Sequence, residues 1–279
     1  ASKYLLTASL RADGSSTLAK GHKWGYFPSV AGGWRIIEEN WMKDQKWLSN
    51  LKLRASWGIS GNAAIDAYST LASLSSTTYY YYLGNTDVAG KIPSQMGNSN
   101  LTWEKTSSFN LGLDFGFLDG RISGSVDYYW NHTYDLLFYK TAPASSFPTV
   151  IDNIGKTKGQ GLEVSLMTDI IRTKDFDWTA NWSYSHFKDK ITELTGGVDK
   201  YVSGTKGLFV GNRVNAFYDY KVLGEWGIGE FAQYVDDFKA AHDGKAPACA
   251  STKGYGTPGS PKMYDADGDG AITSDDRVL

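Results

Sequence analysis

The stretch GRISGSVDYYWN, residues 120–131, decides the fold because its side chains alternate between two kinds. An extended chain places successive side chains on opposite faces. One face carries the apolar row Ile122, Gly124, Val126, Tyr128 and Trp130, and the other carries Ser123, Ser125, Asp127 and Tyr129. This period of two predicts a β-strand. A soluble sandwich would turn the apolar row toward a packed core, whereas a membrane barrel would turn it toward lipid.

The same alternation recurs along much of the chain. It is present in YLLTASLR (4–11), LKLRASWGIS (51–60), SFNLGLDFGF (108–117), GLEVSLMT (161–168) and WTANWSYSHF (178–187), and is more mixed in WGYFPSVAGGWRI (24–36). Most of these runs reach about ten residues, the length of a tilted bilayer-spanning strand and more than the usual strand of a soluble sheet. The 18 Tyr, 12 Phe, 10 Trp and 31 Gly, beside only 7 Pro and 4 Met, also favour long strands. The sequence therefore predicts an all-β chain.

Composition narrows the function classes. Because 28 Lys and Arg are balanced by 30 Asp and Glu, the chain has no bulk attraction for nucleic acid. The single cysteine, Cys249, excludes an internal disulfide framework and a multi-thiolate metal site. No apolar run approaches the ~18 residues of a membrane-spanning helix, and the N-terminus does not have the pattern of a signal peptide. We expect the chain to begin inside a strand and to be an internal piece of a longer protein.

The connections between the expected strands alternate in length. Only LDG (118–120) and DIIRTKDFD (169–177) join two of the strand pairs, whereas the polar and aromatic gaps 61–101 and 132–150 are long. Outer-membrane barrels have this asymmetry, with short periplasmic turns and long extracellular loops. The segment IEENWMKDQKWLSN (37–50) predicts a short surface helix among the short connections, since acidic residues lead and lysines follow. After about residue 190 the alternation weakens, although 215–226 could form one more strand.

The two rows of each strand differ in a way that favours lipid on the apolar side. The polar rows contain small or ionisable residues that suit a wet or plugged lumen, and the charged members expected to face it are Arg11, Lys52, Arg54, Asp114, Asp127 and Glu163. Aromatic residues near strand ends are candidates for interfacial girdles or, alternatively, ordinary sheet packing: Trp24, Trp34, Trp57, Tyr128, Trp130, Trp178 and Trp182. Because open sheet edges are not tolerated in lipid, we expect part of an antiparallel transmembrane β-barrel with long extracellular loops.

Several ordered segments also resemble a known family. They are LLTASLRADGSS, WGYFPSVAGGWRI, WLSNLKLRASWGISGN, NLTWEKTSSFNLGLDFGFLDGRISGSVDYY, NIGKTKGQGLEV, AFYDYKVLG and YDADGDGAITSDDR. Together they resemble the SusC/RagA-type TonB-dependent outer-membrane transporters over nearly the whole chain. The resemblance implies part of a 22-stranded barrel in the bacterial outer membrane and no enzymatic step. It also implies a SusD-like surface lipoprotein lid, contact with the TonB complex through regions outside this chain, and import of oligosaccharides or peptides.

This resemblance gives an expected division of the chain. Residues 1–235 would form the partial barrel, and residues 236–279 would form an extracellular loop region. Compared with that family, we expect this sequence to lack the plug, the TonB-contacting box and the last strands of the barrel. Two other functions remain open from the residues alone: a secreted soluble β-rich glycan-binding module, in which the aromatic residues would line a lectin site, and a surface glycosidase, for which no pair of carboxylates is designated.

The sequence DADGDGAITSDD, residues 265–276, has the spacing of an EF-hand-type loop. The expected oxygen ligands are Asp265, Asp267, Asp269, the Ala271 carbonyl, Thr273 and Asp276, with Gly270 at the sharp turn. Ca²⁺ requires six to eight oxygen ligands, which this spacing could supply. Aspartate at the twelfth position has a shorter reach than the usual glutamate, and no flanking helix pattern is evident. Calcium binding and a solvated turn held by Asp side chains both remain open.

A second candidate lies in the first long connection. Tyr79, Tyr80, Tyr81 and Tyr82 could stack on sugar rings or on a lid protein, or could simply pack the loop down. The stretch GNTDVAGKI (84–92) does not fit a phosphate-binding loop, because its glycines are spaced one residue too far apart and Ile92 replaces the hydroxyl. The four histidines are scattered and show no spacing typical of a metal site.

Overall fold

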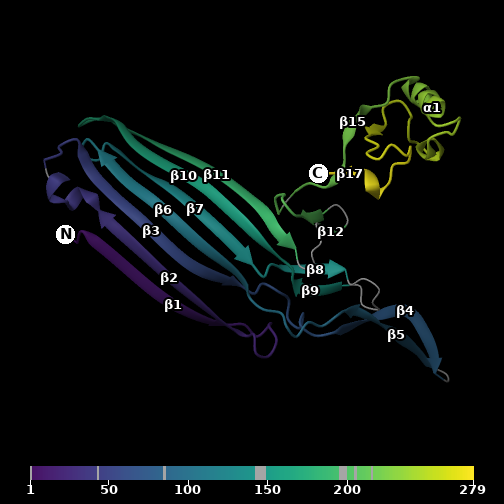
Figure 1. Ribbon diagram of the computed structural model, residues 1–279, viewed down its shortest axis with the longest axis horizontal. Helices are drawn as coiled ribbons and strands as arrows, with labels where there is room; N and C mark the ends of the chain where they lie inside the picture. Colours follow the sequence, from purple (N-terminus) through teal and green to yellow (C-terminus); the bar gives the residue numbers. More distant parts are fainter. Residues whose placement is uncertain are drawn as a thin grey trace. The chain divides into compact units, whose positions relative to one another are not determined.

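The computed structural model describes residues 2–42, 44–83, 86–141, 149–194, 200–203, 206–214 and 216–279. Its main element is a seven-stranded antiparallel sheet in the order β1-β2-β3-β6-β7-β10-β11 (Figure 1). The strands are β1 (Tyr4–Gly14), β2 (Trp24–Arg35), β3 (Leu48–Asn62), β6 (Glu104–Phe117), β7 (Ile122–Tyr134), β10 (Gly155–Arg172) and β11 (Asp177–Leu194). Each contains one of the stretches whose alternation predicted a strand, so the all-β antiparallel prediction is confirmed.

The strands are longer than the alternation indicated. The strands β10 and β11 each have 18 residues, and only residues 173–176 separate them. Residues 118–121 join β6 to β7, and the left-handed Leu118, Asp119 and Gly120 (φ 52°, 52° and 83°) make this turn tight. These two short turns lie at one end of the sheet and the two longest connections, 63–103 and 135–154, lie at the other, as the spacing predicted.

The long connections carry two hairpins of their own (Figure 1). One consists of β4 (Ser73–Leu83) and β5 (Thr86–Gln95), and the other of β8 (Leu137–Thr141) and β9 (Thr149–Asn153). A small buried cluster holds this end together, and its members are Leu18, Phe27, Leu101, Trp103 and Ile151. The Phe27 and Trp103 rings pack edge to face, with their centroids 5.4 Å apart. The loop end is thus an ordered hydrophobic assembly that brings together residues from three connections.

The connection after β2 differs from the expected helix. In place of one short surface helix over 37–50, it contains two 3₁₀ turns, η1 (Ile36–Glu38) and η2 (Asn40–Met42). The Glu39 carboxylate accepts hydrogen bonds from the Tyr4 hydroxyl (2.9 Å), the Trp34 indole (3.1 Å) and the Lys3 ammonium (3.2 Å). These bonds to Lys3, to β1 and to β2 hold the connection against the sheet. The segment is nevertheless a short-end connection, as predicted.

Two compact units make up the chain. The first comprises residues 1–201 and 209–214, and the second comprises residues 202–208 and 215–279. In the second unit, β14 (Asp219–Tyr220) pairs with β17 (Arg277–Val278), and β15 (Val222–Glu225) pairs with β16 (Pro261–Met263). The expected single strand over 215–226 was therefore wrong. Its two halves pair with different partners, and Gly224 at φ 144° interrupts the ladder.

The second unit also contains elements that the sequence analysis missed. The helix α1 (Glu230–Ala241) begins after the left-handed Gly229 and ends before Gly244, whose N–H donates to the Lys239 carbonyl at 2.8 Å. It runs through residue 235, where the division of the chain was expected. The 3₁₀ turns η3 (Ala248–Ser251) and η4 (Ser274–Asp276) follow. The short strands β12 (Lys200–Ser203) and β13 (Lys206–Phe209), whose residues are divided between the two units, pair with each other. Among the described helices, none is both long and apolar enough to cross a bilayer.

Candidate functional site

The register of the seven strands gathers the polar rows onto one face of the sheet. Lys52 is opposite Asp114, Arg54 is opposite Gly112, Gly112 is opposite Asp127, and Asp127 is opposite Glu163. Arg11, opposite Phe27 on the first two strands, belongs to the same face. All six charged residues that the sequence assigned to a lumen therefore share one surface, which we call the polar face.

An ionic network crosses three strands on the polar face. The Arg54 Nε donates to both Asp114 carboxylate oxygens at 2.9 Å, and its Nη2 lies 2.8 Å from Asp114 Oδ1 and 3.0 Å from Asp127 Oδ2. Lys52 Nζ is 4.0 Å from Asp114 Oδ2. The geometry is possible because residue 112, between the two acids, is glycine: a Cβ there would come within 2.5 Å of Asp127 Oδ1 and 2.8 Å of the Arg54 guanidinium. The guanidinium fork thus joins β3, β6 and β7.

Hydroxyl pairs continue the polar face on both sides of this network. Ser9 and Ser29 lie 2.7 Å apart, Thr106 and Thr133 2.8 Å apart, and Ser125 and Ser165 2.9 Å apart, each pair across neighbouring strands. Arg11 forms an ion pair with Asp13 at 2.8 Å. A surface of paired hydroxyls and compensated charges can be solvated or can contact a polar solute.

The opposite face, which we call the apolar face, exposes large hydrophobic side chains. Leu6 is 80% exposed, Tyr26 64% and Trp182 65%. All seven aromatic residues expected in girdles belong to this face by the register and the alternation of the strands. A soluble protein rarely leaves so large a continuous apolar surface in water. Lipid accommodates it without cost.

The aspartate-rich loop brings three of its predicted ligands together. One carboxylate oxygen from each of Asp265, Asp267 and Asp269 lies within 4.8 Å of the others. Within this loop Asp265 accepts the N–H groups of Gly268 and Gly270 at 2.7 and 2.8 Å, and Asp269 accepts that of Ala271 at 2.7 Å. These bonds fix the turn while leaving further lone pairs on the oxygens. Hard cations such as Ca²⁺ take this kind of ligand.

The remaining predicted ligands have different surroundings. Asp276 is fully buried, and its two oxygens accept the N–H groups of Ala266 and Thr273, both at 2.7 Å. The Thr273 side chain accepts the Asp275 N–H and completes a capping box with Asp276 at the start of η4. Asp276 therefore ties the two ends of the loop together and is not part of the three-aspartate group. The Ala271 N–H is held by Asp269 in this same turn.

An aromatic cluster supports this loop and was not found by sequence reasoning. The Trp226 ring packs against Phe231, Tyr234 and Tyr255 with centroids 5.0 to 6.0 Å apart. Burial raises the pKa of the Tyr234 hydroxyl and the pKa of the neighbouring Cys249 thiol, so both groups stay uncharged at neutral pH. The Cys249 N–H donates to the Gly270 carbonyl at 2.8 Å. The i, i+3 spacing of Phe231 and Tyr234 on a short helix was the available signal.

The tyrosine run occupies the first loop hairpin. Tyr79 to Tyr82 belong to β4, where the register places Tyr81 opposite Val88 of β5. Their side chains lie outside the described residues, so their role in stacking on a sugar or a lid protein stays a prediction.

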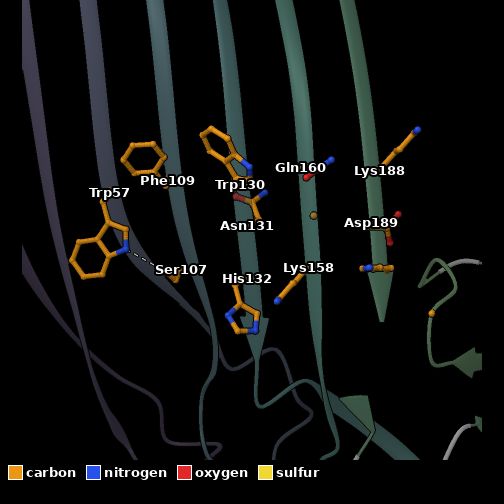
Figure 2. Close-up of a pocket in the computed structure, with 13 residues that line it drawn as sticks. Trp57, Ser107, Phe109, Trp130, Asn131, His132, Lys158, Gln160, Lys188 and Asp189 are labelled. Atoms are coloured by element: carbon orange, nitrogen blue, oxygen red, sulfur yellow. Dashed lines mark hydrogen bonds between the residues drawn. The ribbon is translucent and has the colours of Figure 1, made fainter. Parts of the chain in front are cut away.

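A groove on the apolar face was also missed. It has a volume of about 800 Å³ and lies where the aromatic residues Trp57, Phe109 and Trp130 meet lysines of β10 and β11 (Figure 2). The Trp57 indole donates to the Ser107 hydroxyl at 3.0 Å across β3 and β6. The sequence does contain lysines near the loop ends of the apolar rows, namely Lys158, Lys188 and Lys190. That they lie side by side becomes visible only when the pairing of the strands is known.

Comparison with known proteins agrees with the geometry. The family model described as "TonB dependent receptor-like, beta-barrel" matches residues 1–260. The TonB-dependent receptor SusC of Bacteroides thetaiotaomicron is 40% identical over 237 residues, covering 78% of this chain and 24% of that protein. The TonB-dependent receptor P3 of Formosa agariphila is 34% identical over 289 residues, covering 100% of this chain and 27% of that protein.

A solved structure gives the same answer for the fold. The structure of the RagAB peptide importer in its closed-closed state matches with a TM-score of 0.70 and 31% identity, over 80% of this chain and 24% of that one. The chain thus spans about a quarter of the length of these relatives. Proteins of this kind reside in the outer membrane, and that location excludes a secreted soluble module. The chain belongs to the TonB-dependent receptor β-barrel family, and within it to the SusC/RagA type.

Proposed function

We propose that the chain forms part of the wall and outer loops of a nutrient importer, with its polar face lining the lumen and its apolar face in lipid. The observation that carries the proposal is the register, which places Arg54, Asp114 and Asp127 on one face and the exposed aromatic residues on the other. Burying the charged polar face in hydrocarbon would cost free energy, whereas burying the aromatic apolar face there would not. No step of covalent chemistry is assigned to the chain, and the relatives named above are receptors and transporters rather than enzymes.

Arginine substitution at matched depth tests the orientation. Leu113 on β6 is opposite Val126, which in turn is opposite Val164 of β10, so Ser165 lies at nearly the same depth on the other face. In the full-length protein, we expect Leu113→Arg to lower the free energy of unfolding by roughly 2–4 kcal/mol in lipid, as for arginine near a bilayer midplane. Ser165→Arg should cost clearly less, since it would enter water. The measurement is urea unfolding in vesicles, followed by tryptophan fluorescence.

The outcome separates the two faces directly. A larger loss for Leu113→Arg than for Ser165→Arg supports the proposed orientation. Equal losses, or a larger loss for Ser165→Arg, would show that the polar face is not the wet one.

The substrate and the partners follow from the relatives. RagAB is a peptide importer, and the SusC/RagA resemblance implies oligosaccharide or peptide cargo, a SusD-like surface lipoprotein lid and energy from the TonB complex. The long loop hairpins are the elements of this chain that such a lid would meet. Growth of a strain lacking the full-length gene, on single glycans and on peptides as the limiting nutrient, tests this part. Loss of growth on one class, restored by the intact gene, identifies the cargo, whereas unchanged growth on every member contradicts nutrient import.

We further propose that the aspartate-rich loop binds Ca²⁺ through Asp265, Asp267 and Asp269, and that the ion orders an extracellular loop without taking part in transport. The convergence of their oxygens within 4.8 Å supports it, because three carboxylates this close repel one another unless a cation lies between them. Asp276 would hold the loop closed around the ion through its two backbone hydrogen bonds.

Limited proteolysis of the detergent-solubilised full-length protein tests the calcium site. With calcium present we expect slow cleavage in residues 264–277, and faster cleavage after EDTA, because the ion stabilises the folded loop. The double variant Asp265→Ala, Asp269→Ala should be cleaved fast in both conditions. A control variant, Asp236→Ala, Asp237→Ala, removes two exposed acids of α1 and should behave as the unmodified protein. If EDTA leaves cleavage of the unmodified loop unchanged, the motif is a polar turn.

A further inference from the structure

The groove at the loop end of the apolar face has two levels that differ in chemistry. The register aligns Trp57, Phe109, Trp130, Gln160 and Lys188 across β3, β6, β7, β10 and β11. One step closer to the loops, it aligns Ser107, His132, Lys158 and Lys190. An aromatic belt is therefore followed, toward the loops, by a polar row that contains the two lysines Lys158 and Lys190. Figure 2 shows Trp57, Phe109 and Trp130 of the belt and Lys158 of the polar row.

The three lysines of this groove, Lys158, Lys188 and Lys190, have no acidic partner among the described residues. Lys158 of β10 is directly opposite Lys190 of β11 and, on its other side, opposite His132. Like charges directly opposite each other on one face destabilise a sheet. Within the described part of the chain, Lys158, Lys188 and Lys190 form no ion pair, whereas the Nζ of the neighbouring Lys156 lies 2.7 Å from Glu193 Oε2.

The acid that lies at the groove is engaged elsewhere. Asp189 lines it, but alternation along β11 assigns its side chain to the polar face, and its Oδ2 accepts the Val214 N–H at 3.1 Å. Among the described residues that line the groove, three exposed lysines therefore lie beside a single acid. A bound anion would remove the repulsion between Lys158 and Lys190.

We propose that this groove binds the phosphorylated headgroup of an outer-leaflet lipid. The inference rests on the proposed orientation of the apolar face. Aromatic rings occupy the boundary between hydrocarbon and headgroups, so lysines one level above Trp57 and Trp130 lie at headgroup depth. Their flexible stems let the ammonium groups reach a phosphate from within this boundary. The acyl chains of the same lipid would cover the exposed faces of Trp57, Phe109 and Trp130, which are 38%, 40% and 43% exposed.

The test uses full-length protein in nanodiscs of phosphatidylcholine containing a small fraction of monophosphoryl lipid A. The triple variant Lys158→Gln, Lys188→Gln, Lys190→Gln removes the cations, and Lys46→Gln, Lys174→Gln, Lys253→Gln removes the same charge elsewhere. Retained lipid A is counted by native mass spectrometry after transfer to detergent. Lysines near an anionic surface contribute additively, so we expect about a tenfold or larger loss of retention in the groove variant and none in the control.

Three further arms make the result decisive. Replacing the same lysines by arginine should restore retention, which separates lost charge from misfolding. Dephosphorylated lipid A should be retained poorly by every variant, and inorganic phosphate at equal concentration should not protect the unmodified protein against heat, because the site requires the acyl chains as well. Equal retention by the groove variant and the control would overturn the proposal, as would a changed oligomeric state with unchanged retention, since the face would then contact a second copy.

Failure of the orientation is detected separately. Brominated acyl chains quench tryptophans that touch hydrocarbon, and the variants Trp57→Phe and Trp130→Phe show how much of the quenching comes from the groove. Quenching at these positions with unchanged lipid A retention overturns only the headgroup site. No quenching there would overturn the proposed orientation itself and the headgroup site with it.

Discussion

At the scale of single residues, the missing side chain of Gly112 makes room for Arg54 of β3 to contact acids of β6 and β7. A Cβ at this position would lie 2.5 Å from Asp127 Oδ1 and 2.8 Å from the Arg54 guanidinium. We expect Gly112→Ala to lower the free energy of unfolding by about 1–3 kcal/mol, the usual cost of overpacking, because both neighbours are held by the ion pair. The measurement is the temperature at which the full-length protein loses its compact electrophoretic mobility in detergent.

The matched control is Gly32→Ala. An added Cβ there would meet only the Leu5 carbonyl at 4.0 Å, so the change should be within about 0.5 kcal/mol of zero or slightly stabilising. If Gly112→Ala and Gly32→Ala lose their compact mobility at the same temperature, the absence of a side chain at Gly112 is not required by the network.

At the scale of elements, the Arg54 network joins β3, β6 and β7 more strongly than an exposed pair would. Its side chains are 17–32% exposed for Arg54, Asp114 and Asp127, so solvent screens them only in part. Asp114→Asn combined with Asp127→Asn leaves Arg54 without a carboxylate partner, and we expect a loss of about 1–3 kcal/mol in unfolding free energy. Urea unfolding of the full-length protein in vesicles measures it.

The comparison for this element is Asp13→Asn, which removes the partner of Arg11. These side chains are 62% and 33% exposed, and exposed pairs contribute about 0–1 kcal/mol. A double variant of Asp114 and Asp127 that is no less stable than Asp13→Asn would mean that the strands are joined by their backbone ladder alone.

At the scale of the whole molecule, the exposed apolar face predicts how the full-length protein partitions. Because this face needs hydrocarbon, we expect the protein to stay with the membrane after a high-salt or carbonate wash and to require detergent for extraction, while a periplasmic protein is released by the same wash. Fractionation followed by immunoblotting measures it. Monodisperse full-length protein obtained without detergent would contradict the assignment of the apolar face to lipid.

The sequence by itself determined the strands and their two faces. Alternation in GRISGSVDYYWN and its counterparts is a local property, since the period of two fixes which side chains share a face whatever the neighbouring strands are. The all-β fold, the alternation of short and long connections and the family could therefore be predicted without coordinates, as could the aspartate spacing of residues 265–269.

Only the tertiary structure decided what depends on pairing between distant segments. The register brought Arg54 to Asp114 and Asp127, and aligned Lys158 with Lys190 beside the aromatic belt. It also divided 215–226 between two partners, and Glu39 held the connection after β2 to the sheet, where a helix had been predicted. These outcomes follow from contacts tens of residues apart, whose energies a local pattern does not contain. The burial of Asp276 away from the three-aspartate group is of the same kind, because hydrogen bonds across the loop determine it.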